Sequence, residues 1–279
     1  MRCEPAGPVV HPPAPPSSYA EGVSIQVVLV HGIRTSATMW RSQVEWLTAN
    51  GIPANAVDLP AHGTRRDEDF TLHEALHTID AAVRAAADDG PVLLVGHSMG
   101  GLLALAYAGG EDAPPIAGVV AVSCTALPRA AALRAYRVLA GAMNSLPGRG
   151  QWLTDRVLAA TLPTETRGDF AAGGYAFDAQ DAALSSLAAL DLETALSRIR
   201  IPLWFVNGQY DQLRVSEALF QRLAPHAELI VVPRTSHLVT AMRPSIFNAV
   251  LRLAVAVLDA RGGALRGSGS DSAPPREYW

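Results

Sequence analysis

Short apolar runs alternate with amphipathic stretches along most of the chain. The apolar runs, several of them rich in β-branched residues, predict buried strands, at residues 23–30, 54–58, 91–95, 116–123, 202–206 and 228–232. The stretches with helical periodicity predict helices, at residues 38–50, 70–87, 99–108, 215–223 and 243–258. Because alternating strands and helices are typical of a parallel sheet covered on both faces, we expect an α/β fold on a mainly parallel sheet.

This rhythm is interrupted between residues 125 and 200, where the pattern is helical and rich in Ala and Leu. We interpret these residues as a helical lid inserted between two strands, with ordinary covering helices as the alternative. Residues 1–22 are rich in proline and residues 261–279 in glycine, serine and proline, which predicts two tails. The expected core therefore comprises 23–124 and 201–260, with the lid at 125–200 and a flexible C-terminal tail at 261–279.

The amino-acid composition indicates a globular protein and excludes some classes of partner and mechanism. The chain has 279 residues, 49% of them hydrophobic and 17% charged, which is enough to bury a large core. Its net charge of −4 gives no electrostatic reason to expect nucleic acid or an anionic membrane as a partner. All 22 basic residues are arginine, which excludes any mechanism that needs a lysine.

The cysteines and the terminal residues indicate the cellular compartment in which we expect the protein. Cys3 and Cys124 do not resemble a disulfide framework. The N-terminal residues lack the apolar segment of a signal peptide, and no run reaches transmembrane length. We therefore expect a cytoplasmic protein without a membrane span, whose oligomeric state the sequence leaves unknown.

A serine pentapeptide stands between a predicted strand and a predicted helix. It reads Gly96-His97-Ser98-Met99-Gly100. Glycines on both sides of a serine permit a turn so tight that the hydroxyl stands above the sheet, which is the pattern of a nucleophile elbow. The pentapeptide alone arises often by chance, so its place between strand and helix is what makes it specific.

A serine hydroxyl needs a neighbouring base, which an acid in turn orients. Asp211 follows the strand at 202–206, and His237 follows the strand at 228–232. The loops after parallel strands share one edge of a sheet, so both side chains can meet Ser98 there. Three other acids lie inside the predicted lid and remain alternatives to Asp211, namely Asp178, Asp181 and Asp191.

Five motifs in order along the chain resemble those of one family. Val30-His31-Gly32 resembles its His-Gly turn, and residues 58–63 resemble its Asp-x-Pro-Gly-His-Gly turn, with Ala61 in place of Gly. The other three are the serine pentapeptide, the acid loop Gly208-Gln209-Tyr210-Asp211, and His237 followed by Pro244. Over residues 23–258 the chain therefore resembles lid-bearing α/β-hydrolases of the esterase, lipase and haloperoxidase-like group.

The resemblance implies a serine hydrolase that needs no cofactor and no metal. Ser98 would attack the carbonyl of an ester, thioester or lactone, with His237 as base and Asp211 orienting it. The backbone N–H groups of Ile33 and Met99 would form the oxyanion hole. An apolar lid over such a site favours an apolar small molecule as substrate.

Other functions on this fold are weighed against that one. C–C bond hydrolases and cofactor-free haloperoxidases share the same three side chains, and a hydrolase-fold protein can also serve as a ligand receptor. Epoxide hydrolases and haloalkane dehalogenases use an Asp where Ser98 stands, which excludes them. Arg34 is a candidate contact for a substrate carboxylate, and the alternative is a solvated or lid-paired arginine.

A second motif points to a different chemistry. His73-Glu74-Ala75-Leu76-His77 matches H-E-x-x-H, which on a helix presents two imidazoles to zinc. The third ligand of the metzincins would stand at Val83, and the helix is expected to lie away from the catalytic edge, so we expect no metal there. We expect four further residues to have packing or turn-forming roles: His31, His62, His97 and Cys124.

Overall fold

The structure is a computed structural model that describes residues 24–111, 114–128, 138, 141–142 and 145–268, with side chains up to residue 262. Its strands are β1 (Gln26–Val30), β2 (Ala54–Val57), β3 (Val92–His97), β4 (Ile116–Val122), β5 (Leu203–Gly208) and β6 (Glu228–Val232). Its α-helices are α1 (Arg41–Ala49), α2 (Leu72–Ala87), α3 (Met99–Ala108), α5 (Gln151–Thr161), α6 (Thr164–Ala172), α7 (Gln180–Ala188), α8 (Leu192–Arg198), α9 (Glu217–Leu223), α10 (Val239–Met242) and α11 (Pro244–Ser268). Short 3-10 helices are η1 (Ala37–Trp40), η2 (Gly63–Arg65) and η3 (Pro147–Gly150). The predicted tail 1–22 and residues 269–279 lie outside the described residues.

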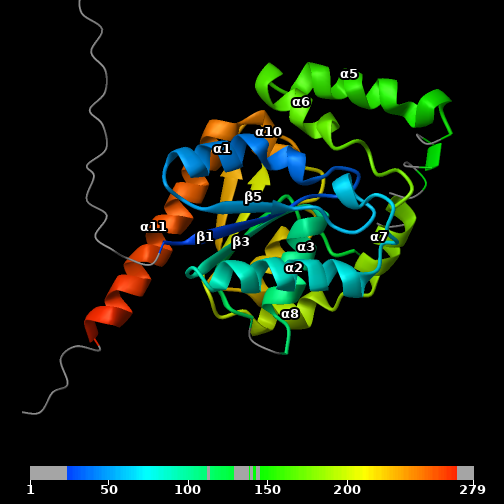
Figure 1. The fold of residues 1–279 in the computed structure, drawn as a ribbon. Coiled ribbons are helices and arrows are strands. Elements are labelled where there is room, and N and C mark those ends of the chain that lie inside the picture. The colour runs from blue at the N-terminus through cyan, green and yellow to red at the C-terminus, as the bar shows by residue number, and fades with distance from the viewer. Residues whose placement is uncertain (1–23, 112–113, 129–137, 139–140, 143–144, 269–279) are drawn as a thin grey trace, which may run out of the picture.

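The strands form one six-stranded sheet in the order β2-β1-β3-β4-β5-β6 (Figure 1). Every neighbouring pair is parallel, which confirms the expected parallel α/β architecture. The register pairs Val30 with Gly96 and Gly208 with Val232. The loops that leave β1 and β3 are therefore neighbours at the carboxyl edge of the sheet, and so are the loops that leave β5 and β6.

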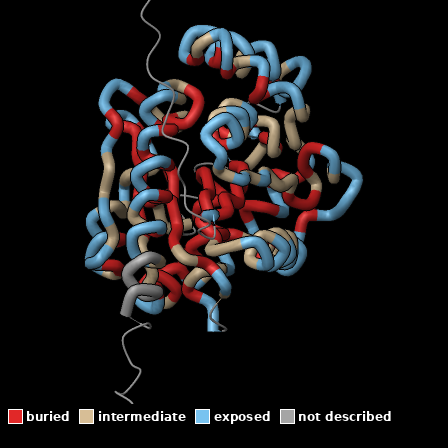
Figure 2. The backbone as a smooth tube through the Cα atoms, turned by 60° about the vertical axis from the view of Figure 1, so that its left-hand side comes forward, coloured by how far each residue is buried: buried red, intermediate tan, exposed pale blue. Residues whose placement is uncertain are grey.

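Each face of the sheet carries its own hydrophobic cluster. Val28 and Leu94 pack in the cluster beneath α2, α3, α7, α8 and α9. Val27 and Leu93 point the other way, into the cluster beneath α1, α10 and α11. Figure 2 shows the resulting buried interior as a red band through the middle of the molecule. Because alternate side chains leave opposite faces, strands buried on both faces appear in the sequence as unbroken apolar runs.

The segment predicted to be a lid, residues 125–200 and here called the lid segment, has two structurally different parts. Among its described residues no strand occurs, and α5 to α8 follow one another. α7 and α8 cover the sheet, because Leu187, Leu192 and Leu196 belong to the cluster beneath α2 and α3. α5 and α6 lie outside that layer, at the top of Figure 1, where α6 packs against η1 and α10. Since η1 and α10 follow the ends of β1 and β6, α6 lies at the carboxyl edge of the sheet.

The last helix is longer than the sequence pattern predicts. α11 continues to Ser268, so residues 261–268 of the predicted C-terminal tail are helical. Two glycines in succession cost a helix about 1 kcal/mol each, but the Ala, Leu and Arg that follow Gly263 are strong helix formers. Within the described ranges, α11 included, none of the helices combines the length and apolarity needed to span a bilayer.

Candidate active site

Ser98 occupies a strained turn between β3 and α3. Its backbone has φ 53° and ψ −114°, a region that residues with a side chain rarely adopt. A Cβ on Gly96 would collide with the carbonyl group of Gly100, so this turn requires a glycine there. Strain of this kind is found mainly at functional sites, and here it places the serine at the carboxyl edge of the sheet.

The structure brings Ser98, His237 and Asp211 into one hydrogen-bonded chain. Nε2 of His237 lies 3.0 Å from Oγ of Ser98. Nδ1 of His237 lies 3.1 and 3.2 Å from the two carboxylate oxygens of Asp211. A carboxylate only accepts, so Nδ1–H donates to Asp211 and Nε2 is left to accept from the serine hydroxyl.

Asp211 is ionised at neutral pH. Burial on its own would raise the pKa of this carboxyl, but the hydrogen bond and charge of His237 lower it. The N–H of Leu213, 2.9 Å from Oδ1, lowers it further. The net pKa is below the ordinary value, so the carboxylate can stabilise a positive charge on the imidazole.

The loop that carries Asp211 is bonded directly to the loop that carries His237. The N–H of Tyr210 donates to the carbonyl of Thr235 over 2.9 Å. The N–H of Arg234 donates to the side-chain oxygen of Gln209 over 3.0 Å. These bonds continue the pairing of β5 and β6 into the two loops and fix the acid relative to the base.

A partly buried polar network around Asn207 was not predicted from the sequence. The amide of Asn207 donates to Oγ1 of Thr125 and to Oε2 of Glu217, both at 2.8 Å. Arg214 binds the same carboxylate, with Nε 2.7 Å from Oε2. The sequence offered one indication of this network. Asn207 is a polar residue near the end of an otherwise apolar strand, shortly before the acid. The network ties the loop after β4 to the loop after β5.

Ile33 and Met99 lie on two turns that are packed together. Ile33 follows β1, Met99 begins α3, and β1 and β3 are neighbours in the sheet. A Cβ on Gly100 would lie 2.5 Å from the carbonyl oxygens of Val30 and His31, so the start of α3 rests on the turn after β1. Neither the N–H of Ile33 nor that of Met99 has a hydrogen-bond partner within the described residues.

Two buried histidines hold the turns around these groups. Nδ1–H of His31 donates to the carbonyl of Gly32 over 2.8 Å, and its Nε2 accepts from the N–H of Leu59 over 3.0 Å. Burial lowers the pKa of His31 to about 3, so its ring is neutral. His62 is also buried, and burial lowers its pKa. Asp58 accepts from the N–H groups of two nearby residues in these turns, Ala37 and Thr64.

The other acids raised by the sequence are engaged elsewhere. Asp178 is exposed and forms an ion pair with Arg149 at 2.6 Å. Asp181 is exposed on α7, and Asp191 caps α8 by accepting from the N–H of Thr194 over 3.1 Å. Of the four candidate acids, the structure places only Asp211 against His237, as far as the described residues extend.

His73, Glu74 and His77 of the H-E-x-x-H motif lie on the exposed side of α2, whereas Ala75 is buried. The side chain of His73 is 88% exposed, and its ring stacks with that of His77 at a centroid distance of 6.4 Å. In the part of the chain that the structure describes, no group of three or more His, Cys, Asp or Glu side chains could hold a metal ion. His73 and His77 have no contact with Ser98, Asp211 or His237 among the ring contacts and ion pairs of the described residues.

The lid segment contacts the turn after β1 through Phe177. The guanidinium carbon of Arg34 lies 4.5 Å from the centroid of the Phe177 ring, a cation–π contact. Arg66 donates from Nη2 to the carbonyl of Gly173 over 2.9 Å. The structure thus shows Arg34 paired with the predicted lid, as in the alternative given above. The bond from Arg66 to Gly173 was missed, because neither periodicity nor a motif links residues so far apart.

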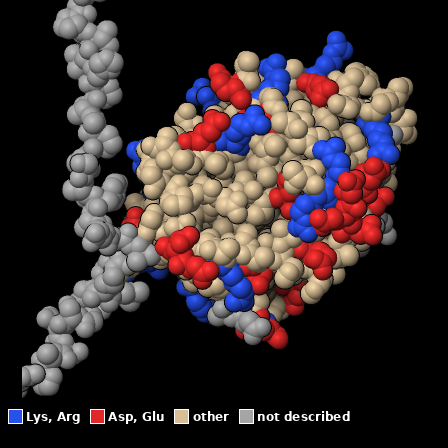
Figure 3. All heavy atoms as spheres, in the orientation of Figure 1, with Lys and Arg blue, Asp and Glu red and all other residues tan. Residues whose placement is uncertain are grey.

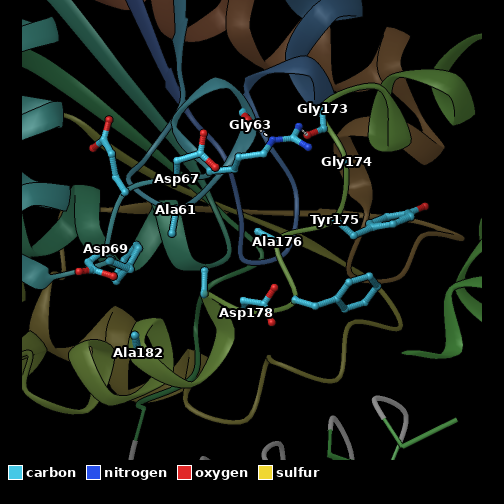
Figure 4. Close-up of a pocket in the computed structure, with 15 residues that line it drawn as sticks. Ala61, Gly63, Asp67, Asp69, Gly173, Gly174, Tyr175, Ala176, Asp178 and Ala182 are labelled. Atoms are coloured by element: carbon cyan, nitrogen blue, oxygen red, sulfur yellow. Dashed lines mark hydrogen bonds between the residues drawn. The ribbon is translucent and has the colours of Figure 1, made fainter. Parts of the chain in front are cut away.

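A cavity of about 470 Å³ lies beside this contact, between residues 61–70 and 173–182 (Figure 4). Its walls combine Tyr175 and Phe177 with acidic side chains, among them Asp67 and Asp178. Ser98, Asp211 and His237 are not among the residues that line it. On the face shown in Figure 3, arginines and acidic side chains are interspersed around a broad uncharged area.

Comparisons with known proteins agree with the observed fold. A model described as the alpha/beta hydrolase family matches residues 27–250, which is more than half of the chain. A probable esterase, PIR7A, of Oryza sativa subsp. indica is 45% identical over 83 residues, 28% of this chain and 32% of that protein. A putative 2-succinyl-6-hydroxy-2,4-cyclohexadiene-1-carboxylate synthase of Haemophilus influenzae is 32% identical over 85 residues, 30% of this chain and 34% of that protein.

The curated relatives are matched over only about a third of their length. A solved structure extends the likeness to most of the fold. A thermophilic esterase from Thermogutta terrifontis, with malate bound, has a TM-score of 0.66 and 20% identity, covering 85% of this chain and 92% of that one. At this identity the likeness shows the fold alone.

Proposed function

This chain belongs to the alpha/beta hydrolase family, and on that premise we propose that it is a serine hydrolase for a carboxylic ester, thioester or lactone of an apolar small molecule. The observation that carries the proposal is the hydrogen-bonded chain from Ser98 through His237 to Asp211. Its support is threefold: the strained turn under the serine, the ionised acid, and the N–H groups of Ile33 and Met99, which have no hydrogen-bond partner among the described residues.

In the first half of the reaction, Oγ of Ser98 attacks the substrate carbonyl while Nε2 of His237 takes the hydroxyl proton. The N–H groups of Ile33 and Met99 bind the oxygen that becomes negative in the tetrahedral intermediate. His237 then gives the proton to the departing alcohol, thiol or ring oxygen, and Ser98 is left acylated. Asp211 stabilises the charged imidazole throughout.

In the second half, water attacks the acyl group on Ser98 and gives its proton to Nε2 of His237. A second tetrahedral intermediate collapses, the acid leaves, and the proton returns to Oγ of Ser98. The cycle consumes one water and uses only groups of this chain, so the proposal requires no cofactor and no metal.

The proposal assigns the outer part of the lid segment to the substrate. α6 is fastened beside the carboxyl edge, because Oγ1 of Thr38 donates to the carbonyl of Asp169 over 2.6 Å. Arg41 forms an ion pair with the same residue at 2.8 Å. These contacts support a roof of α5 and α6 over the site, and its apolar side chains favour an uncharged acyl or alcohol group.

Labelling with a fluorophosphonate probe tests the assignment of the nucleophile. Wild-type protein should be labelled stoichiometrically, whereas Ser98→Ala should not be labelled and should lose on the order of 10⁶ in kcat on p-nitrophenyl esters. Ser197→Ala, which removes an exposed serine on α8, is the matched control and should behave as wild type.

Two results contradict the proposal. One is a Ser98→Ala variant that keeps more than about a thousandth of the wild-type kcat, because loss of the nucleophile costs far more. The other is a folded wild-type protein that the probe does not label and that turns over no ester, which favours a ligand receptor built on this fold.

A further inference from the structure

His97 contacts the backbone of the residue that carries the proposed base. Its side chain is buried, and its Nε2 lies 3.0 Å from the carbonyl oxygen of His237, 140 positions away in the chain. A carbonyl oxygen only accepts, so Nε2 of His97 carries a proton and donates it. The centroids of the two imidazole rings are 5.0 Å apart.

The other side of the His97 ring faces the turn after β1. A Cβ on Gly32 would lie 2.8 Å from Nδ1 of His97, so the ring packs directly against this glycine. Nδ1 is buried and has no hydrogen-bond partner within the described residues. Burial lowers the pKa of His97 to about 3, which keeps the ring neutral and leaves Nδ1 without a proton.

An unpaired buried nitrogen is unfavourable, and an apolar side chain of the same size would avoid it. Packing alone therefore does not account for an imidazole here. What the imidazole provides, and an apolar side chain does not, is the donated hydrogen bond to His237. The bond joins the turn that carries Ser98 to the loop that carries the base.

We propose that His97 is a positioning residue, which holds the His237 ring over Ser98 by binding the His237 carbonyl and packing against Gly32. The inference rests on the proposed serine mechanism. His97 touches no reacting atom. It therefore affects the reaction rate only by fixing the position of Nε2 of His237. Because Gly32 precedes Ile33, the same ring also fixes the turn that carries one proposed oxyanion donor.

A matched pair of variants separates the hydrogen bond from the packing. In His97→Gln the amide N–H takes the place of Nε2–H, whereas His97→Met has the same length and no donor. A displacement of about 1 Å at a catalytic group can cost about 10²-fold. We expect His97→Met to lower kcat about 10- to 100-fold with KM within about threefold of wild type, and His97→Gln to restore most of that loss.

The measurements are kcat and KM on p-nitrophenyl acetate, the rate of fluorophosphonate labelling, and the melting temperature of each variant. A slower labelling rate for His97→Met than for His97→Gln, at matched melting temperatures, supports the proposal. Equal kcat for the two variants overturns it, as does a loss confined to KM or to the melting temperature.

The hydrogen bond itself is tested without any turnover. In ¹⁵N-histidine-labelled wild-type protein, the imidazole of His97 should appear as the neutral Nε2–H tautomer at neutral pH. A charged ring or the Nδ1–H tautomer overturns the inference. Absence of labelling and turnover in wild-type protein is a different result, because it overturns the proposed function while the tautomer still reports on this contact.

Discussion

Several neighbours together determine the ionisation state of Asp211. Its carboxylate is buried, yet His237 and the N–H of Leu213 keep its pKa below the ordinary value. Asp211→Asn should lower kcat by roughly 10⁴, because the amide favours the wrong tautomer of His237. Asp178→Asn, which removes an exposed acid of the lid segment, is the control and should leave kcat unchanged.

The comparison is made on p-nitrophenyl acetate, with circular dichroism to confirm that both variants fold. If Asp211→Asn keeps wild-type activity while Asp178→Asn is inactive, the acid has been assigned to the wrong residue.

At the scale of the elements, the proposed role of the lid segment in substrate choice depends on which of its side chains contact the rest of the fold. Phe177 packs on Arg34, the residue after Ile33, whereas Trp152 on α5 is 51% exposed. We expect Phe177→Ala to shift the preferred acyl chain length several-fold, because a methylene in an apolar pocket is worth about 1–3 kcal/mol. Trp152→Ala should shift it in the same assay by a smaller factor, because about half of its surface already faces solvent.

A series of p-nitrophenyl esters of increasing chain length measures both effects at once. Activity on the acetate ester should change least, because Ser98, Asp211 and His237 are carried by the sheet. An unchanged profile in both variants, or an equal loss on short and long esters, would mean that these side chains only pack.

The strands of the sheet and the loops at their ends could be predicted from the sequence. What each helix between residues 125 and 200 packs against could not. The buried strands leave a strong apolar signal, and Ser98, Asp211 and His237 stand in the loops that follow three of them, so their positions followed from local sequence. The sequence assigned α8 to the lid, although it covers the sheet. A helix over the sheet and a helix over the site can have the same Ala and Leu content, so composition does not distinguish them. A lid-paired Arg34 was an alternative at the sequence level, but its partner Phe177 could not be named. The bond from His97 to His237 was not foreseen, because both contacts arise only from packing and no local pattern encodes them.

For the whole molecule, the buried histidines predict sensitivity to acid. Burial lowers the pKa of His31 and of His97 from 6.5 to about 3, so below about pH 6 these two side chains bind protons in the unfolded chain and not in the folded one. His62, whose pKa burial also lowers, acts in the same direction. Stability rises with pH wherever the unfolded state binds more protons, so it must fall on acidification in this range. Each such proton contributes roughly 1.4 kcal/mol per pH unit, and those of His31 and His97 together contribute about 3.

Urea unfolding at a series of pH values between about 7 and about 4 measures this slope. Asp58 and Asp211, whose pKa values are lowered, add to the loss once the pH falls through the carboxylate range. In His97→Gln one of these protons is absent, so the slope should fall by roughly 1.4 kcal/mol per pH unit. A free energy of unfolding that stays level from about pH 6 to about pH 4 would contradict the prediction.

The position of the lid segment between β4 and β5 also divides the proposed machinery into two halves. Residues up to 128 carry Ser98 and both oxyanion donors, whereas residues from 145 onward carry Asp211 and His237. The two halves meet where β4 pairs with β5 inside the sheet, for example at Val119 and Leu203. If the chain were cut between these strands and the fragments produced separately, neither would hydrolyse an ester alone. Turnover on mixing would then report fragment complementation, so the fold has the layout of a split-enzyme sensor.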